Sequence, residues 1–293
     1  MSLPEFVHFS PRSLDEASGL LMQYGDQARV LAGGTDLLVK MKQRRLVPRY
    51  VVNIKRIRDL DYIAHEPGKA LRIGALTTLE TLNRSVVVRK TFAVLHDAVS
   101  SMGTLEIRNR GTLAGNVCNA SPAAETVPAL MLLGARATLV GRSGSRSVAL
   151  DSLFAAPGRT VLCPGELLTE IQIPEPDPLA FGAYDKFSLR RMDLAVVGAA
   201  AALEFEDGIC RKAAIVLSAV APTARRMQSA AAMLEGRAID ERLIDDAAHE
   251  AAAQANPRTD LWGTVDYKRN AAAALVTRVV KRALERAGRR EPS

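Results

Sequence analysis

Cysteine is scarce in this chain of 293 residues, which contains three cysteines far apart in the sequence, Cys118, Cys163 and Cys210. No two of them form a Cys-x-x-Cys motif, so we expect neither a zinc site nor an iron–sulfur cluster in this chain. An odd number of isolated cysteines also argues against a disulfide framework and for a reducing, cytoplasmic location. The four histidines show no metal-ligand spacing, and we therefore predict no metal site.

Long hydrophobic runs are also lacking. No apolar run reaches the ~18 residues that a membrane-spanning helix needs, and residues 1–5 have neither the basic nor the apolar region of a secretory signal. Aromatic residues make up 4% of the chain, too few for platforms that stack nucleic-acid bases, and the basic residues behind the net charge of +7 are dispersed. The composition therefore argues against a membrane span and a nucleic-acid partner. It favours a solvated basic surface or one that meets acidic protein partners.

Hydrophobic periodicity and turn residues predict an α+β protein of two or three packed units. The first unit is expected to begin as strand, helix, strand, with a helix that Ser13 caps and Gly25 ends. Residues 174–178, Pro-Glu-Pro-Asp-Pro, form a linker and the best domain boundary. Beyond it, Asp207-Gly208 is a hairpin signal within a small antiparallel sheet backed by helices. The expected strands are 28–32, 50–54, 71–75, 137–140, 170–173, 183–189, 196–206 and 209–220, and the expected helices include 14–24, 37–45, 78–82, 92–102, 125–133, 240–254 and 266–287.

Glycine is concentrated in two segments, which carry most of the functional information. The first glycine segment, residues 31–38, reads LAGGTDLL, and the second glycine segment, residues 108–116, reads RNRGTLAGN. Glycines leave backbone N–H groups uncovered, so two such segments can hold the two halves of a pyrophosphate from opposite sides. The pattern predicts a nucleotide cofactor, although neither segment matches GxGxxG or GxxxxGK[ST].

The side chains of these segments refine the prediction. The first segment is expected between a strand and a helix N-terminus, where Thr35 can donate to a phosphate and Asp36 fits better as a helix cap or a partner of hydroxyls. After the second segment begins, Asn116 and Ser121 can bond to backbone or ligand, and Glu125 can accept from ribose or ribityl hydroxyls. The alternative is that both segments are only turns whose glycines allow unusual backbone angles.

The sequence around the glycine segments resembles one known family. AGGTDLL at 32–38, IGALTTLETL at 73–82 and RNRGTLAGNVCNASPAAE at 108–125 resemble the flavoprotein (medium) subunit of molybdenum hydroxylases. This is the xanthine dehydrogenase family, and the similarity is to its carbon monoxide dehydrogenase type. The resemblance continues through ELLTEIQIP at 166–174 and YDKFSLRR at 184–191, and it covers almost the whole chain in the same order.

The resemblance implies FAD bound between a two-part N-terminal domain and a C-terminal domain. The first would be of the vanillyl-alcohol-oxidase or PCMH type, at residues 1–176 with subdomains 1–57 and 58–176. The second would resemble the carbon monoxide dehydrogenase flavoprotein C-terminal domain, at residues 180–289. By position, the two glycine segments would contact the pyrophosphate from opposite sides, and no catalytic residue is expected on this chain. The residues expected to bind FAD are Ala32, Gly33, Gly34, Thr35, Asp36, Leu37, Thr112, Leu113, Ala114, Gly115, Asn116, Glu125, Leu168 and Lys186.

Four positions carry the finer expectations from the resemblance. Glu125 stands where the family usually has aspartate, and its longer side chain can still accept from a hydroxyl. Leu168 and Lys186 match positions beside the isoalloxazine ring, where a cation near the pyrimidine end would stabilise the anionic reduced flavin. The alternative for Lys186 is a lysine on a surface strand. Leu194 stands where carbon monoxide dehydrogenases carry a tyrosine, so we expect that face of the ring to be less covered.

The function that the resemblance implies is electron transfer within a heteromeric molybdenum hydroxylase. A large partner would carry the molybdenum cofactor and a small partner two [2Fe-2S] clusters, in a dimer of heterotrimers. Electrons would pass from the clusters to FAD on this chain and then to an external acceptor. Two alternatives remain: a stand-alone FAD-dependent oxidase or dehydrogenase, and a non-enzymatic basic binding module.

Overall fold

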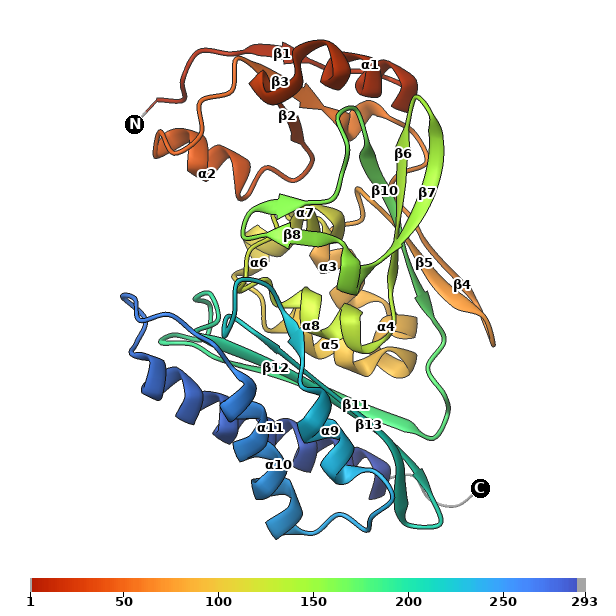
Figure 1. The fold of residues 1–293 in the computed structure, drawn as a ribbon. Helices are drawn as coiled ribbons and strands as arrows, with labels where there is room; N and C mark the ends of the chain where they lie inside the picture. The colour runs from red at the N-terminus through yellow and green to blue at the C-terminus, as the bar shows by residue number, and fades with distance from the viewer. Residues whose placement is uncertain (1, 289–293) are drawn as a thin grey trace.

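A computed structural model describes residues 2–288. Three main sheets follow one another from the N-terminal to the C-terminal side of the molecule (Figure 1). The N-terminal sheet is parallel, with strand order β1-β3-β2, so its last strand lies in the middle. Its elements are β1 (Val7–Phe9), α1 (Leu14–Tyr24), η1 (Gly25–Gln27), β2 (Ala28–Leu31), α2 (Leu37–Lys42), β3 (Tyr50–Asn53) and η2 (Ile54–Arg56).

Local sequence explains how α1 is bounded. Ser13 accepts a hydrogen bond from the backbone N–H of Glu16 at 3.1 Å, as an N-cap should. Gly25 ends the helix with φ 47°, in the left-handed region that favours glycine. The predicted helix at 14–24 is confirmed, and it leads into β2 and the first glycine segment.

The middle sheet is antiparallel, and its strands run in the order β4-β5-β10-β6-β7. Strand β10 is the last of these strands in the sequence and again lies in the middle of its sheet. Short helices lie between this sheet and the C-terminal one (Figure 1). The elements of the middle unit are β4 (Ile63–Glu66), β5 (Ala70–Gly74), α3 (Leu79–Arg84), α4 (Val86–Thr91), α5 (Ala93–Ser100), α6 (Leu105–Arg108), α7 (Leu113–Cys118), α8 (Thr126–Leu132), β6 (Arg136–Gly141), β7 (Gly144–Ala149), η3 (Leu150–Ser152), β8 (Phe154–Ala156), β9 (Arg159–Thr160) and β10 (Leu167–Pro174).

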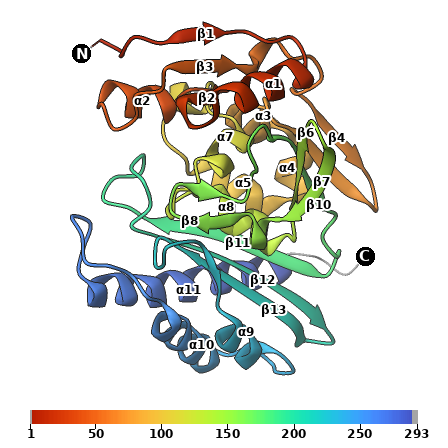
Figure 2. The same ribbon diagram turned by 45° about the horizontal axis from the view of Figure 1, so that its top comes forward.

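The C-terminal sheet is antiparallel in the order β11-β12-β13-β14 and is covered on both faces. Helices α5 and α8 contact one face, and α9 and α11 contact the other (Figure 2). The hairpin predicted at Asp207-Gly208 is confirmed, with φ of 50° and 78° at its two turn residues. The elements are β11 (Ala180–Phe187), β12 (Val197–Glu206), β13 (Ile209–Ser218), β14 (Arg225–Arg226), α9 (Gln228–Leu234), α10 (Glu241–Gln254) and α11 (Val265–Gly288).

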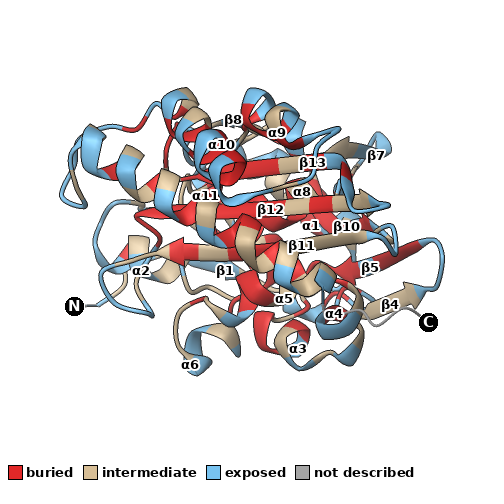
Figure 3. Cartoon of the chain, turned by 90° about the horizontal axis from the view of Figure 1, so that it is seen from below, coloured by how far each residue is buried: buried red, intermediate tan, exposed pale blue. Residues whose placement is uncertain are grey.

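The largest hydrophobic core of the C-terminal unit lies between β12, β13 and the helices α9 to α11. Figure 3, viewed from that side, shows the long helices exposed on their outer faces and buried where they meet the sheet. The predicted fold class, α+β with a small antiparallel sheet backed by helices, is confirmed. The elements that the prediction missed include β4, β7, α4, α6, α7 and α9, which are short. Strand β7 is mostly exposed and lacks the alternation of a half-buried strand.

A buried carboxylate links the C-terminal unit to the middle unit. Asp97 on α5 has a side chain that is 8% exposed and forms ion pairs with Arg282 at 3.0 Å and Arg286 at 2.9 Å, both on α11. Its Oδ2, which also pairs with Arg286, accepts from the backbone N–H of Tyr184 on β11 at 3.3 Å. These contacts hold β11 against the middle unit and so place Lys186, two residues further along this strand, near α8.

Candidate cofactor-binding site

The first glycine segment connects β2 to α2, as predicted. Within the described part of the chain, the backbone N–H groups of residues 33–37 have no hydrogen-bond acceptor. Gly34 has φ 81°, which other residues adopt at a cost. A row of free N–H groups at the start of a helix is suited to an anion, because the helix dipole adds to their partial positive charges.

Asp36 stands at the N-cap position of α2, but its side chain makes no capping bond, so of the two roles predicted for it the helix cap is wrong, and a partner of hydroxyls stays a prediction. Instead it accepts from the side-chain amide of Asn119 at 3.0 Å, and Lys40 donates to the amide oxygen of the same residue at 2.5 Å. Desolvation raises the pKa of Asp36, although Lys40 and Asn119 oppose the shift. This side chain ties the first segment to the end of α7 and leaves the backbone amides free.

The sequence of the second glycine segment suggested an open loop, but most of its backbone N–H groups form hydrogen bonds within the chain. Thr112 caps α7, and its hydroxyl accepts from the N–H of Gly115 at 3.0 Å while its carbonyl accepts from that of Asn116 at 3.0 Å. The N–H of Leu113 donates to the carbonyl of Thr77 at 3.2 Å. Of residues 113–116, only Ala114 keeps a free backbone N–H within the described chain. The expectation of several free amides therefore applies to the first segment and not to the second.

The two glycine segments touch each other directly. A Cβ atom at Gly33 would lie 2.0 Å from the carbonyl oxygen of Arg110, far inside any van der Waals contact. Lys55 on η2 donates to the carbonyl of Ala32 at 3.0 Å and also holds the first segment in place. Glycine is needed at position 33 because the neighbouring backbone occupies the place of a side chain.

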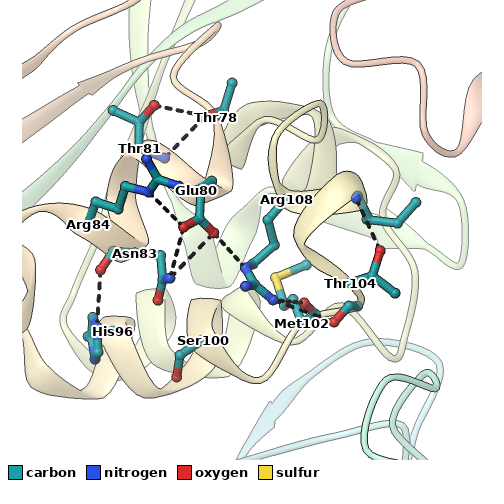
Figure 4. A network of polar contacts seen from close by, with 12 residues as sticks. Thr78, Glu80, Thr81, Asn83, Arg84, His96, Ser100, Met102, Thr104 and Arg108 are labelled. Carbon is teal, nitrogen blue, oxygen red and sulfur yellow. Dashed lines mark hydrogen bonds and ion pairs between the residues drawn. The ribbon is translucent and has the colours of Figure 1, made fainter.

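A charged network around Arg108 holds the start of the second segment in position (Figure 4). The buried carboxylate of Glu80 on α3 pairs with Arg108 at 2.9 Å and with Arg84 at 3.0 Å, and Asn83 contacts it at 3.4 Å. Arg108 also donates to the carbonyl of Met102 at 3.0 Å. Burial opposes ionisation of Glu80, but its bonds to Arg108, Arg84 and Asn83 outweigh that effect and lower its pKa. The network anchors the residue at which the second segment begins.

A cavity of about 600 Å³ runs between the two segments, and its walls include most residues that were expected to bind FAD. Its size is typical of small-molecule and cofactor sites. The side chain of Leu113 lies in the hydrophobic core of the middle unit, fully buried, and neither Leu113 nor Lys186 lines the cavity. Among the lining residues are Ala32, Gly33, Gly34, Thr35, Asp36, Leu37, Thr112, Ala114, Gly115, Asn116, Ser121, Glu125, Leu168 and Leu194.

Glu125 and Lys186 form a buried ion pair at the boundary between the middle and C-terminal units. Their side chains are each 4% exposed, and Lys186 Nζ lies 3.1 Å from Glu125 Oε1. Lys186 also donates to the carbonyl of Asp193 at 2.7 Å. Lys186 is thus neither a surface lysine nor exposed in the cavity: it lies behind Glu125 and fixes the loop that carries Leu194. One of the Glu125 oxygens is engaged by this pair.

Sequence reasoning missed several residues of the cavity and its support. Lys40, Asn119, Met102 and Met192 line the cavity without belonging to either glycine segment. The helical spacing of Glu80 and Arg84 could have indicated an ion pair. No local pattern links Glu80 to Arg108, because the contact depends on how α3 and α6 pack.

Among residues 2–288, no cluster of histidine, cysteine, aspartate and glutamate side chains could hold a metal ion. None of the helices in that range combines the length and the apolar character that crossing a membrane requires.

Comparison with known proteins identifies the family. Residues 4–176 match the model of the FAD binding domain in molybdopterin dehydrogenase, and residues 182–283 match that of the CO dehydrogenase flavoprotein C-terminal domain. The chain belongs to the molybdopterin dehydrogenase flavoproteins. It is an FAD-binding medium subunit of the molybdenum hydroxylase and xanthine dehydrogenase family, and hence part of an oxidoreductase.

Individual members of the molybdopterin dehydrogenase flavoproteins are similar along nearly their whole length. The carbon monoxide dehydrogenase medium chain of Afipia carboxidovorans is 36% identical and aligns over 96% of this chain and 98% of its own. The glyceraldehyde dehydrogenase medium chain of Sulfolobus acidocaldarius is 30% identical, over 95% and 98%. The solved carbon monoxide dehydrogenase from Hydrogenophaga pseudoflava superposes with a TM-score of 0.94 at 33% identity, covering 98% of this chain and 99% of that one. The fold and the FAD cofactor inferred from the sequence are therefore confirmed.

Proposed function

We propose that this chain is the electron-transfer subunit of a heteromeric molybdenum hydroxylase. It would receive electrons from two [2Fe-2S] clusters on a small partner chain and pass them through FAD to an external acceptor. The observation that carries the proposal is the cavity in which the free amides of the first glycine segment lie beside the second. Relatives described as medium chains or as subunits of a complex support the existence of partner chains.

The residues of the cavity fit FAD, and each can be given a task. The free N–H groups of residues 33–37 would hold the pyrophosphate, since anions bind favourably at such a helix start. Thr112 and Ala114 would close the other side, and the free oxygen of Glu125 would accept from a ribityl or ribose hydroxyl. Leu168 would form an apolar wall beside the ring. When bound, FAD supplies a ring that accepts and releases electrons.

Lys186 would act on the flavin from behind Glu125. A buried cation lowers the free energy of a nearby anion, and its net effect on the reduced flavin would be smaller than that of a lone lysine because Glu125 carries the opposite charge. Lys186 also holds the carbonyl of Asp193 and thereby the loop at residues 188–195. Its task would be both to orient Glu125 and to keep this loop beside the cavity.

We further propose that FAD is bound without a covalent bond. Cys118 lies on the cavity wall and is the cysteine nearest to the second glycine segment. Although its side chain is open to the cavity, the surrounding protein raises the pKa of its thiol to about 12 through desolvation. A thiol that stays protonated at neutral pH is a poor nucleophile, which disfavours attachment.

The domain division and the assembly are part of the same proposal. We place the FAD-binding domain at residues 1–176, with subdomains 1–57 and 58–176, and the C-terminal domain at 180–289, whose last residue lies outside those that the structure describes. The two matching family models support this division. A large subunit with the molybdenum cofactor and a small [2Fe-2S] subunit would complete a heterotrimer, doubled to a dimer and located in the cytoplasm.

Electron transfer in the assembled complex tests the function. The chain is co-expressed with its partner subunits, and substrate-driven reduction of an artificial acceptor is compared between FAD-loaded and FAD-stripped complex. We expect stripping to abolish acceptor reduction while the [2Fe-2S] clusters are still reduced, and added FAD to restore it. Full acceptor reduction without FAD would refute the proposal. Turnover of substrate by the isolated FAD-loaded chain would instead support a stand-alone oxidase or dehydrogenase.

A further inference from the structure

A second cavity of about 850 Å³ borders the two glycine segments, and the proposed function leaves it unused. It shares Ala32, Gly33 and Thr112 with the FAD cavity, so backbone of the glycine segments forms part of both walls. The rest of its lining comes from η2, from the residues that lead to β4, from Arg72 on β5, from Leu76 and Thr78 before α3, and from Asn109 and Arg110 of the second glycine segment. It is large enough for a molecule of nucleotide size.

Three cations in this cavity have no carboxylate partner within the described chain: Lys55, Arg58 and Arg110. The ammonium of Lys55 donates to the carbonyl of Ala32, whereas the guanidinium groups of Arg58 and Arg110 have no hydrogen bond to another described residue. By contrast, Arg72 in the same cavity is neutralised by Glu170 at 2.7 Å. Within the described chain, one cation of this cavity is paired with a carboxylate and the other three are not.

Lys55 and Arg110 are close enough to repel each other. Desolvation, followed by the charge of Arg110, lowers the pKa of Lys55. Two cations placed together without an anion are unfavourable by themselves, and a bound oxyanion would remove the repulsion. Arginine and lysine together also supply the donors that phosphate oxygens accept most readily.

The remaining lining suits the organic part of a phosphorylated ligand. The carboxylates of Asp59 and Asp61 can accept from sugar hydroxyls. The ring of Tyr62 is fixed because its hydroxyl donates to Glu170, and Leu76 adds apolar surface beside it. A fixed aromatic ring next to apolar surface can receive a planar base.

We propose that this cavity binds a phosphorylated small molecule of nucleotide size, with a phosphate between Lys55 and Arg110. The ligand is distinct from FAD and binds while FAD is present, because the two cavities are lined by largely different residues.

Calorimetric titration of the FAD-saturated chain tests the proposal, with ADP, inorganic phosphate and adenosine as probes. We expect ADP to bind and adenosine to bind much more weakly, and ADP affinity to fall as the salt concentration rises. Inorganic phosphate that binds as tightly as ADP would overturn a ligand of nucleotide size, whereas tighter binding of ADP than of phosphate would support it. Flavin absorbance is recorded in parallel, and release of FAD by ADP would overturn the proposal, because the cavity would then belong to the FAD site.

Matched variants locate the site. Arg110→Met and Lys55→Met should each weaken ADP binding by about tenfold, the effect of one charge-assisted contact. Arg56 is the neighbour of Lys55 and lines neither cavity. Arg56→Met therefore removes the same charge outside the site and should leave ADP affinity unchanged. FAD content and melting temperature are measured for each variant. Equal ADP affinity in all three variants, or equal affinity of wild type for adenosine and ADP, would contradict the proposed site.

Discussion

The two glycine segments look alike in sequence and differ in structure. In the first, the backbone amides of residues 33–37 have no acceptor among residues 2–288, and glycine is required at position 33 because the chain passes within contact of Arg110. In the second, Thr112 and Thr77 occupy most of the amides, and the segment is held by the charged network of Glu80 (Figure 4). Glycine-rich segments therefore have two different roles here. The first presents backbone donors to a ligand, and the second allows a tightly capped helix to lie close to that ligand.

The largest effect is expected at the ion pair that follows the second segment. Lys186→Met would leave Glu125 charged and buried without its partner, and we expect a loss of about 3–5 kcal/mol in unfolding free energy. Urea denaturation measures it. The double variant Lys186→Met with Glu125→Gln should recover most of this loss, because no charge is then unpaired. A single variant as stable as wild type would show that water reaches Glu125.

The double variant and Glu125→Gln alone differ only in the Lys186 cation, so a comparison of their reduction potentials isolates the electronic effect of Lys186. If the cation contributes about 1 kcal/mol to the reduced flavin, its loss lowers the two-electron reduction potential by roughly 20 mV. Spectroelectrochemical titration of the FAD-loaded protein resolves such a shift. An unchanged potential would leave Lys186 with a purely positioning task.

Gly33→Ala and Gly115→Ala should separate the two kinds of glycine. At position 33 the new Cβ meets the carbonyl of Arg110 at 2.0 Å, so the segments must move apart, and we expect FAD binding to be lost and stability to fall by about 1–3 kcal/mol or more. At position 115 the nearest atom is the Thr112 hydroxyl at 2.8 Å, which a side chain can adjust, and alanine favours the helix. Flavin content and melting temperature are the measurements. Equal loss of flavin in both variants would break the comparison.

Glu80→Gln tests how far the second segment depends on its charged support. Removing the carboxylate leaves Arg108 without its partner, and we expect a loss of about 1–3 kcal/mol. Arg84→Met is the control, since Arg84 is 71% exposed and its pair should contribute less than about 1 kcal/mol. The folded pKa of Glu80 lies below its ordinary value of 4.5. The contribution of the Glu80 ion pairs to the unfolding free energy is therefore complete above about pH 4.5, and it is lost as the pH falls through the lower pKa of Glu80 in the folded chain. In Glu80→Gln, that part of the acid sensitivity should disappear.

The smallest effect is expected from the two threonines. Thr112→Val removes the cap of α7 and should destabilise the FAD-free chain by about 1 kcal/mol. Thr35→Val removes a hydroxyl that has no partner in the described chain, so FAD-free stability should change by less than about 0.5 kcal/mol while FAD affinity falls. Thr112→Ser keeps the cap and serves as a control. A stability loss in Thr35→Val equal to that in Thr112→Val would contradict the distinction between the segments.

Local chemistry made much of the fold predictable from the sequence. The helix between Ser13 and Gly25, the hairpin at Asp207-Gly208 and the strand-to-helix position of the first glycine segment each depend on neighbours in the chain. The family resemblance also predicted that the two glycine segments lie close together. Contacts between distant elements could not be read from it: Glu80 meets Arg108, and Glu125 meets Lys186, only because of how helices pack and how β11 is held.

The directions of the side chains were a second feature of the site that could not be predicted from the sequence. Leu113 stands between residues that line the cavity, yet its side chain is fully buried in the core, because it occupies the inner face of α7. The cap by Thr112 was also hidden, because α7 has only six residues and its periodicity is too short to identify a helix.

The strand order of the two N-terminal sheets has a consequence for synthesis on the ribosome. In each sheet the strand that is made last, β3 or β10, lies in the middle. Until β10 emerges, β4–β5 and β6–β7 are separate hairpins, which are marginally stable alone. Nascent chains stalled after residue 165 should therefore be digested by protease within residues 63–149, whereas chains that expose residue 178 outside the ribosome should resist. The FAD cavity has a wall on β10, so a ribosome-bound chain can acquire its cofactor only after that strand has been inserted.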